Sequence, residues 1–230
     1  MTTPVVAVDG PVAAGKGTLA RRLADHYGFA YLDTGALYRR VGLLVLDAGG
    51  DPGTLDHALA AVPLLESQII EDAALRTDRV GEAASKVAAL TPVREALLSY
   101  QRAFAKAPGT LSDGRSARGA VLDGRDIGTV VCPGAPVKLF VTASPQVRAR
   151  RRFSEFRDKG LTDITYEQVL QDLQARDERD RTRAAAPLVP AEDAHLLDTT
   201  ELDRHMAFEA AREIIDASMS IDRGAPGSGL

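Results

Sequence analysis

Short apolar runs alternate with segments of helical periodicity along most of this chain. The apolar runs predict five strands, at residues 4–9, 30–32, 120–123, 137–142 and 195–198. Helical patterns follow at residues 16–27, 36–46, 145–159 and 166–183, and a final amphipathic helix carries Met206, Ala210 and Ile214 beside Ala207, Ala211 and Ile215. Strands alternating with helices are typical of parallel sheets, so the pattern predicts an α/β fold with a doubly wound, parallel five-stranded sheet.

Several residues predict where these elements begin and end. Thr34 is expected to cap the helix that follows it, and Thr165 with Gln168 has the spacing of a capping box. Between residues 55 and 104 the chain is alanine-rich and helical, with interruptions expected at Pro63, Gly81 and Pro92, so this part predicts short helices in a lobe of their own. Residues 108–119 are expected to form a polar loop, and residues 221–230 a disordered tail.

The composition is that of a soluble globular protein. Apolar residues make up 45% and charged residues 26% of the chain, and the formal net charge of −4 gives no basic field that would draw it to nucleic acid or a membrane. Cys132 is the single cysteine, the first residues lack the pattern of a signal peptide, and no apolar stretch approaches a membrane span. We therefore expect a cytoplasmic monomer that binds neither nucleic acid nor membranes.

The segment between the first strand and the first helix carries the strongest chemical signal. It reads Gly10, Pro11, Val12, Ala13, Ala14, Gly15, Lys16, Gly17, Thr18. This is the spacing of a phosphate-binding loop, with Gly17 inserted before the hydroxyl residue. Backbone amides and the helix N-terminus would bind a polyphosphate, Lys16 would contact its β- and γ-phosphates, and Thr18 would reach a magnesium ion. The alternative is an ordinary strand-to-helix turn with a surface lysine.

Further polar candidates follow the other predicted strands, where open parallel sheets bind ligands. Asp123 ends an apolar run and precedes Gly124, Arg125 and Asp126. A carboxylate at the end of a strand is suited to positioning a magnesium ion or its bound water. The simpler interpretation is that Asp123 only forms a turn before glycine. Asp33 and Thr34 follow the second strand. All these strand ends are expected to face one crevice.

Two arginine-rich helices follow the fourth strand. Arg148, Arg151 and Arg152 share one helical face, and Arg176, Asp180 and Arg183 share a face of the next helix. Helices with alternating charges are usually solvated. The pairing of two such helices, with Gly160 between them, favours a lid that brings arginines over a transferring phosphoryl group and excludes water. An RNA-binding helix is disfavoured by the acidic total charge and the absence of interleaved aromatic residues.

The ordered set of motifs resembles bacterial cytidylate kinases, P-loop proteins of the nucleoside monophosphate kinase family, over about residues 5–200. The matching segments are Gly10 to Thr18, residues 32–39 (LDTGALYR), 84–88 (ASKVA), 93–98 (VREALL), 123–131 (DGRDIGTVV), Arg176 to Arg183, and 186–188 (APL). A phosphate loop alone identifies only a superfamily. The DGRDIGTVV segment is the most specific of the set.

The resemblance implies transfer of the γ-phosphoryl group of ATP to CMP or dCMP with Mg²⁺. It implies that Ser85, Arg94 and Asp126 read the cytosine edge, and that Arg39, Arg125 and Arg183 hold the acceptor phosphate beside Gly124. It also implies that Arg176 and Asp180 approach the sugar hydroxyls, and that Thr34 and Tyr38 line the pocket. On this interpretation Lys16, Arg125, Arg183, Arg148 and Arg152 are the catalytic candidates, and Thr18 and Asp123 the metal-binding ones.

The same resemblance implies a single P-loop kinase domain over residues 1–220. Its core would comprise about 1–34, 105–145 and 184–220, its monophosphate-binding lobe about 35–104, and its lid about 146–183. The short segment between residues 60 and 81 predicts an all-helical lobe.

Ala13 and Ala14 stand where relatives more often have glycine or serine, which the loop should tolerate if their backbone stays in the right-handed or extended regions. A second Asp-Gly-Arg at 113–115 is set aside because only the copy at 123–125 follows a strand and continues into the family pattern. Another nucleoside monophosphate kinase, a small-metabolite kinase such as one for shikimate, and a non-catalytic ATP-binding switch remain as alternatives.

Overall fold

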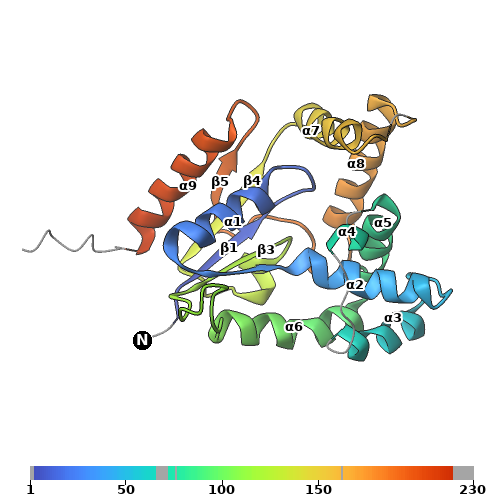
Figure 1. The fold of residues 1–230 in the computed structure, drawn as a ribbon, viewed down its shortest axis with the longest axis horizontal. Coiled ribbons are helices and arrows are strands. Elements are labelled where there is room, and N and C mark those ends of the chain that lie inside the picture. The colour runs from blue at the N-terminus through green and yellow to red at the C-terminus, as the bar shows by residue number, and fades with distance from the viewer. Residues whose placement is uncertain (1–2, 66–71, 76, 162, 220–230) are drawn as a thin grey trace, which may run out of the picture.

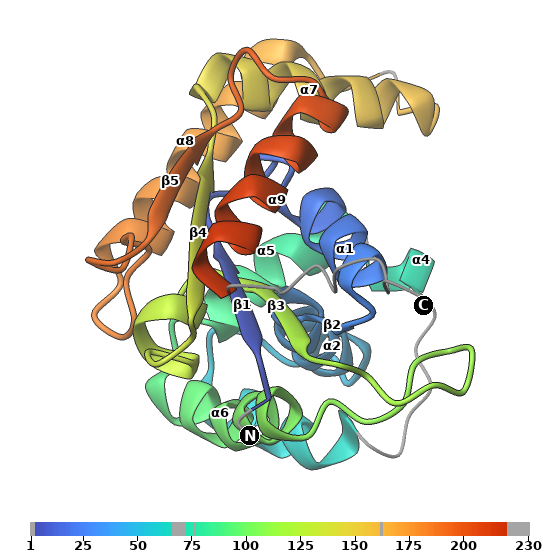
Figure 2. The ribbon, with the colours of Figure 1, turned by 90° about the vertical axis from the view of Figure 1, so that its left-hand side faces the viewer.

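The computed structural model describes residues 3–65, 72–75, 77–161 and 163–219, so the predicted tail lies outside the described residues. A five-stranded sheet with the order β2-β3-β1-β4-β5 forms its centre, and every adjacent pair is parallel (Figures 1 and 2). The strands are β1 (Val5–Asp9), β2 (Ala30–Asp33), β3 (Ala120–Gly124), β4 (Val137–Thr142) and β5 (His195–Asp198). The predicted fold class and all five predicted strands are confirmed.

Helices cover both faces of the sheet, as a parallel sheet requires. The elements are α1 (Lys16–Tyr27), α2 (Thr34–Asp47), α3 (Leu55–Ala61), η1 (Val62–Leu65), α4 (Asp72–Leu75), α5 (Asp78–Val87), α6 (Thr91–Lys106), η2 (Ile127–Val131), α7 (Pro145–Asp158), α8 (Tyr166–Thr182) and α9 (Arg204–Met219). Val6 and Val8 of β1 pack in the cluster that contains α1 and α9 residues, whereas Val5 and Ala7 face α6 and η2. This alternation follows from the two-residue period of a strand.

A separate hydrophobic cluster holds the helices of residues 34–106 together. It contains Val41 and Val45 of α2, Ala58 of α3, Val87 of α5 and Val93 of α6. Gly42 permits α2 and α5 to approach closely, because a Cβ there would lie 2.9 Å from the Ala83 Cβ. All regular elements described within this stretch are helical, in agreement with the prediction. In Figure 1 these helices lie along the bottom and right of the sheet, and α7 and α8 project above them.

Most predicted helix boundaries agree with the structure because local caps define them. The Ser144 side chain accepts from the Val147 amide at the start of α7, and the capping box of Thr165 and Gln168 is formed at the start of α8. The break expected at Gly81 is wrong, since Gly81 lies inside α5. Glycine lowers the stability of a helix without necessarily ending it.

Two further expectations are corrected by tertiary contacts. Asp33, not Thr34, caps α2 by accepting from the Ala36 amide, because the Thr34 hydroxyl donates to the Asp123 carbonyl at 2.8 Å. Met206 is 50% exposed, while α9 buries Phe208 together with Ala211 and Ile215. Among the described residues, no helix has the length and apolarity needed to cross a membrane.

Candidate active site

The loop of residues 10–18 turns tightly between β1 and α1. Gly10 has φ of 149°, and a Cβ at this position would lie 2.0 Å from the Val141 carbonyl oxygen of β4, so any side chain would overlap the neighbouring strand. Gly15 precedes α1 with φ of 86°, a left-handed conformation that glycine adopts readily. The predicted strand, loop and helix of a phosphate-binding loop are therefore all present.

Ala13 departs from the conformation that the sequence led us to expect. Its φ is 59°, which is left-handed and unfavourable for a residue with a Cβ. The condition on which the sequence predicted tolerance of the two alanines, a right-handed or extended backbone, is therefore not met at Ala13. The adjacent Ala14 carbonyl accepts a hydrogen bond from the Thr199 hydroxyl at 3.1 Å.

Lys16 and Asp123 form the polar centre of the sheet's carboxyl edge. The Lys16 Nζ lies 3.8 Å from Asp123 Oδ1, and both side chains are buried. Burial lowers the pKa of Lys16 to about 8 and raises the pKa of Asp123 above its ordinary value. The second oxygen of Asp123 accepts a hydrogen bond from Tyr31 Oη at 3.3 Å. The Asp123 carboxylate is thus oriented by a lysine from the loop and a phenol from β2.

Tyr31 is a site residue that the sequence did not identify. It lies on β2, and the Arg21 guanidinium of α1 stacks over its ring at 4.6 Å from the centroid. Gly17 is needed beside this pair, because a Cβ there would lie 3.0 Å from Asp123 Oδ2 and 3.8 Å from Tyr31 Oη. An aromatic residue in an apolar strand gives no functional signal by itself, since such residues usually pack in the core.

Arginines converge on the same edge from several elements. Arg125 follows β3, and its Nε donates to Asp180 Oδ2 of α8 at 3.1 Å. Arg176 of α8 lies close enough to Arg125, Arg39 and Arg152 for these cations to lower its pKa, which burial already depresses, to about 10. Holding guanidinium groups together away from water is unfavourable unless an anion joins them. This cluster is therefore chemically suited to a phosphate.

A second group of charges lies beside the arginine cluster. Arg94 of α6 is buried, stacks over the Tyr38 ring at 5.4 Å, and forms an ion pair with Asp126. Arg94 is therefore an interior residue, unlike its exposed neighbour Glu95. Arg183 Nη2 lies 3.9 Å from the other oxygen of Asp126. Asp126 thus joins two arginines from different helical segments.

Three buried polar atoms in this region have no hydrogen-bond partner among the described residues: Ser85 Oγ, Arg176 Nε and Arg183 Nη2. Buried donors are almost always satisfied in folded proteins. Three such donors around one cleft, from α5, α8 and the residue after α8, indicate that a polar ligand supplies their partners.

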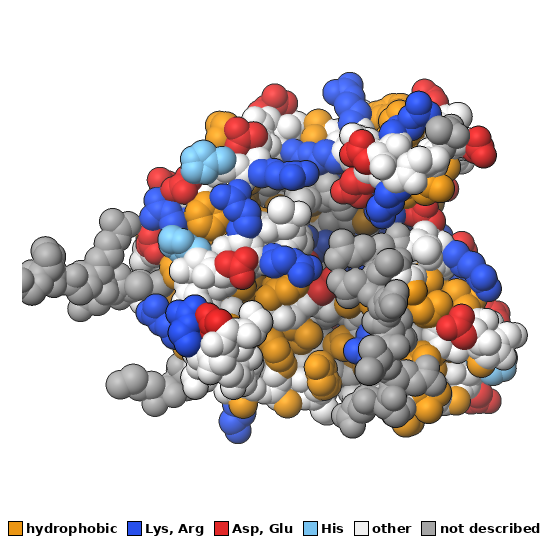
Figure 3. Space-filling model, in the orientation of Figure 1, with side chains coloured by type: hydrophobic (Ala, Val, Ile, Leu, Met, Phe, Trp, Pro, Cys, Tyr) orange, Lys and Arg blue, Asp and Glu red, His pale blue; other side chains and the backbone are white. Residues whose placement is uncertain are grey.

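One cleft of about 1700 Å³ joins the loop to these arginines. Of the residues predicted for the site, the cleft is lined by Val12 to Thr18, Thr34, Tyr38, Arg39, Ser85, Arg94, Asp123 to Asp126, Arg152, Arg176, Asp180 and Arg183. In Figure 3 the corner that carries α7 and α8 bears Lys and Arg together with Asp and Glu, and it overhangs a hollow in this face. The loop of residues 10–18 and the arginine cluster therefore open into a shared cleft.

Three predicted residues do not line the cleft. Gly10 and Pro11 are buried at the start of the loop, and Arg148 is buried beneath the loop. Arg148 donates to the Ala143 carbonyl at 2.9 Å, to the Val12 carbonyl at 3.2 Å and to Asp177 at 2.7 Å. The sequence periodicity placed Arg148 on one helical face with Arg151 and Arg152, but it did not predict these three hydrogen bonds.

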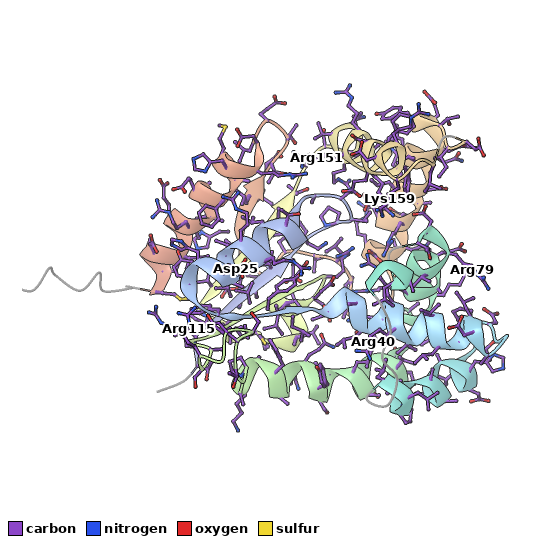
Figure 4. All side chains as sticks on the ribbon, viewed as in Figure 1. Asp25, Arg40, Arg79, Arg115, Arg151 and Lys159 are labelled. Carbon is purple, nitrogen blue, oxygen red and sulfur yellow. The ribbon has the colours of Figure 1, made fainter. Side chains whose placement is uncertain are left out.

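The two other arginines predicted to share this face of α7, Arg151 and Arg152, have different partners. Arg152 bridges to Asp78 of α5 at 2.8 Å, so it links α7 to the helices of residues 34–106. Arg151 donates to the Thr199 hydroxyl and carbonyl at 3.0 and 2.7 Å. In Figure 4, Arg151 and Lys159 flank the upper part of the molecule, whereas Arg115 lies in the loop at its opposite end, so the extra Asp-Gly-Arg does not contribute to the cleft.

Comparisons with known proteins identify the family of this chain. The sequence pattern of the family described as cytidylate kinase matches residues 6–217. A cytidylate kinase of Granulibacter bethesdensis is 56% identical over 92% of this chain and 96% of its own length, and one of Paramagnetospirillum magneticum is 55% identical over 92% and 97%. An uncharacterized protein from Eubacterium ventriosum shares the fold, with a TM-score of 0.52 at 12% identity, over 94% of this chain and 99% of its own. The chain belongs to the cytidylate kinase family.

Proposed function

We propose that this protein transfers the γ-phosphoryl group of ATP to CMP and dCMP with the help of Mg²⁺. The observation that carries the proposal is that Arg39, Arg125 and Arg183 share one cleft with Lys16. Two anionic nucleotides bound end to end would place a donor phosphate near Lys16 and an acceptor phosphate near the arginines. Membership of the cytidylate kinase family supports CMP as the acceptor.

The loop of residues 10–18 would bind the donor. Its amides and the N-terminus of α1 provide the hydrogen bonds and partial positive charge that polyphosphates need, and Lys16 adds a full charge. Thr18 and Asp123 would hold the metal. A single buried carboxylate and one hydroxyl fit Mg²⁺, which commonly retains water and is otherwise bound by substrate phosphates. The ion would neutralise charge on the transferring phosphoryl group.

The arginines would bind the acceptor phosphate. Arg39 and Arg125 lie close enough to Arg176 to lower its pKa, and Arg183 Nη2 has no hydrogen-bond partner among the described residues. Arginine's planar fork suits bidentate phosphate recognition. Arg176 and Asp180, on neighbouring turns of α8, would approach the sugar hydroxyls.

Ser85, Arg94 and Asp126 would recognise the acceptor base. Cytosine presents O2 and N3 as acceptors and an exocyclic amine as donor. Arg94 and the Ser85 hydroxyl supply donors, whereas Asp126 supplies an acceptor. Thr34, Tyr38 and Gly124 would complete the walls of this pocket, as each of them lines the cleft.

Catalysis would depend on positioning and charge stabilisation, because phosphoryl transfer needs neither a covalent intermediate nor a strong base. Lys16, Arg125 and Arg183 are the groups suited to stabilising charge on the transferring phosphoryl group. Arg152 would join them when its ion pair with Asp78 exchanges for a phosphate contact. For Arg148, whose donors are engaged by Ala143, Val12 and Asp177, a supporting role under the loop agrees better with its contacts.

The division into a core, a monophosphate-binding lobe over about residues 35–104 and a lid over about residues 146–183 is part of the same proposal, as is a monomeric state. Lid closure would exclude water, which otherwise competes as acceptor.

A coupled assay of ADP release across CMP, dCMP, UMP, AMP and shikimate tests the proposal. Turnover is expected with CMP and dCMP and much weaker turnover with the others. Preference for AMP would overturn the base assignment, and no turnover with any acceptor would favour a non-catalytic nucleotide switch.

A further inference from the structure

The last residue of β1, Asp9, has a carboxylate that the functional assignments above do not use. It is 5% exposed, and each of its oxygens accepts one backbone hydrogen bond, from the Ile127 amide at 2.8 Å and from the Gly128 amide at 2.7 Å. A buried carboxylate is costly unless it is satisfied in this manner. These two bonds tie the strand before the phosphate loop to η2, more than a hundred residues later in the chain.

The two amides are the first donors of η2, and helix-initiating amides need acceptors. The residue in the N-cap position is Asp126, whose side chain would ordinarily accept from the following turn. Asp126 makes no such bond here. Its carboxylate faces Arg94 and Arg183 instead. Asp9 therefore takes over the capping role and leaves Asp126 available to the cleft.

Gly128 lies beside both Asp9 and Lys138. A Cβ at this position would be in ordinary van der Waals contact with Asp9 Oδ2, at 3.4 Å, and would crowd the Lys138 Cδ of β4 at 3.1 Å. The amide of residue 128 thus reaches the Asp9 carboxylate close to the Lys138 side chain.

We propose that Asp9 is a positioning residue for the acceptor base: by holding the Ile127 and Gly128 amides, it keeps the Asp126 carboxylate directed at Arg94 and Arg183. The inference rests on the proposed function, in which Asp126 and Arg94 recognise cytosine. Asp9 itself does not line the cleft and acts only through the backbone of η2.

The variant Asp9→Asn tests this role. Asparagine has one acceptor oxygen and would present an NH₂ group to one of the two amides, so η2 would shift to relieve the mismatch. We expect the KM for CMP to rise about tenfold and the preference for CMP over UMP to fall, with the KM for ATP changed less than about twofold. An equal loss for both nucleotides, or unchanged values for CMP, would overturn the proposal.

A double-mutant cycle separates positioning from general destabilisation. If Asp9 acts through Asp126, then Asp9→Asn introduced into an Asp126→Asn background has little further effect on the KM for CMP. Additive effects would contradict the inference. Asp9→Glu provides a second route if Asp9→Asn does not fold, because it keeps the carboxylate but lengthens the side chain by one methylene and so displaces the two amides of η2. It should raise the KM for CMP in the same direction, and an unchanged KM for CMP in Asp9→Glu would contradict the inference.

A wild-type protein inactive on CMP would refute the proposed function. An active wild type with a silent Asp9→Asn would refute only the role of Asp9.

Discussion

Arg125 Nε donates to Asp180 Oδ2 at 3.1 Å, which joins the end of β3 to α8 across 55 residues of sequence. The pair places a guanidinium from the sheet edge beside the arginines of α8. The charges of Arg125, Arg176 and Arg183 lower the pKa of the Asp180 carboxyl group although its burial opposes this shift. One carboxylate therefore organises several cations. An incoming acceptor phosphate would bind to arginines that are already oriented.

Replacement of Arg125 by alanine should therefore reduce kcat. We expect a loss of about 10²-fold to 10³-fold, the range seen when one preorganised donor to a developing charge is removed. Arg115→Ala is the matched control, because Arg115 belongs to the other Asp-Gly-Arg copy and forms an exposed pair with Asp113. Steady-state kinetics of both variants, with thermal unfolding as a check on folding, measure the effect. Equal rates for the two variants would mean that residues 123–125 were wrongly chosen.

Arg94→Ala should mainly affect base recognition. The change removes the partner of buried Asp126 and the cation over the Tyr38 ring, so we expect a higher KM for CMP and weaker discrimination against UMP. The measurement is kcat/KM for CMP and UMP. The exposed neighbour Glu95→Ala should leave the ratio unchanged. A persistent preference for cytosine in Arg94→Ala would remove this residue from the base site.

Tyr31→Phe should weaken the response to Mg²⁺. It removes the phenol that donates to Asp123 Oδ2 but retains the ring beneath Arg21. A hydrogen bond to a charged group contributes about 1.5–3 kcal/mol, so we expect at least about a tenfold shift in the Mg²⁺ concentration for half-maximal rate. Tyr100→Phe, at a residue that is 49% exposed, is the control. Superimposable Mg²⁺ titrations for wild type and Tyr31→Phe would contradict the assignment of Asp123.

Gly10→Ala should destabilise the fold more than Gly49→Ala. Both glycines have positive φ, but a Cβ at Gly49 meets nothing within 4 Å, whereas one at Gly10 meets the Val141 carbonyl oxygen at 2.0 Å. Backbone strain alone costs about 1–3 kcal/mol, and overlap with β4 adds to it. Urea unfolding measures the free energy of unfolding that each variant loses. The difference between the two losses separates the cost of a positive φ from the cost of overlap with β4. Equal losses would show that the loop can move away from β4.

Asp9 should make stability depend on pH in an unusual direction. Burial and the nearby charges of Asp123 and Asp126 raise its pKa from 3.8 to about 6 in the folded protein, despite the two amides that oppose this shift. Between these values the folded state binds more protons than the unfolded state, so the contribution of Asp9 to stability is present at low pH and is lost as pH rises to about 6. The loss amounts to about 3 kcal/mol.

Urea unfolding of wild type and Asp9→Asn at several pH values isolates this contribution from that of other groups. The stability of the variant relative to wild type should increase by about 2 kcal/mol between pH 4 and pH 7. Parallel pH profiles would contradict the raised pKa of Asp9.

Local sequence signals predicted most of the fold because they act over a few residues. The apolar run of β4 and the Ser144-Pro145 start of α7 specify their elements through side chains near in sequence. The failures have a different origin. The Thr34 hydroxyl contacts the Asp123 carbonyl instead of capping α2, and Ala13 adopts a left-handed conformation that its residue type does not predict.

The site shows the same distinction. The order and spacing of the loop glycines, Lys16, the Asp-Gly-Arg-Asp segment and the arginines of α8 were sufficient to identify the family, since each motif is contiguous. Three features depended on the tertiary structure: the engagement of Arg148 beneath the loop, the phenol of Tyr31 on Asp123, and the capping of η2 by Asp9. Each joins residues far apart in the chain, and only the packing of the parallel strands brings such side chains within hydrogen-bonding distance.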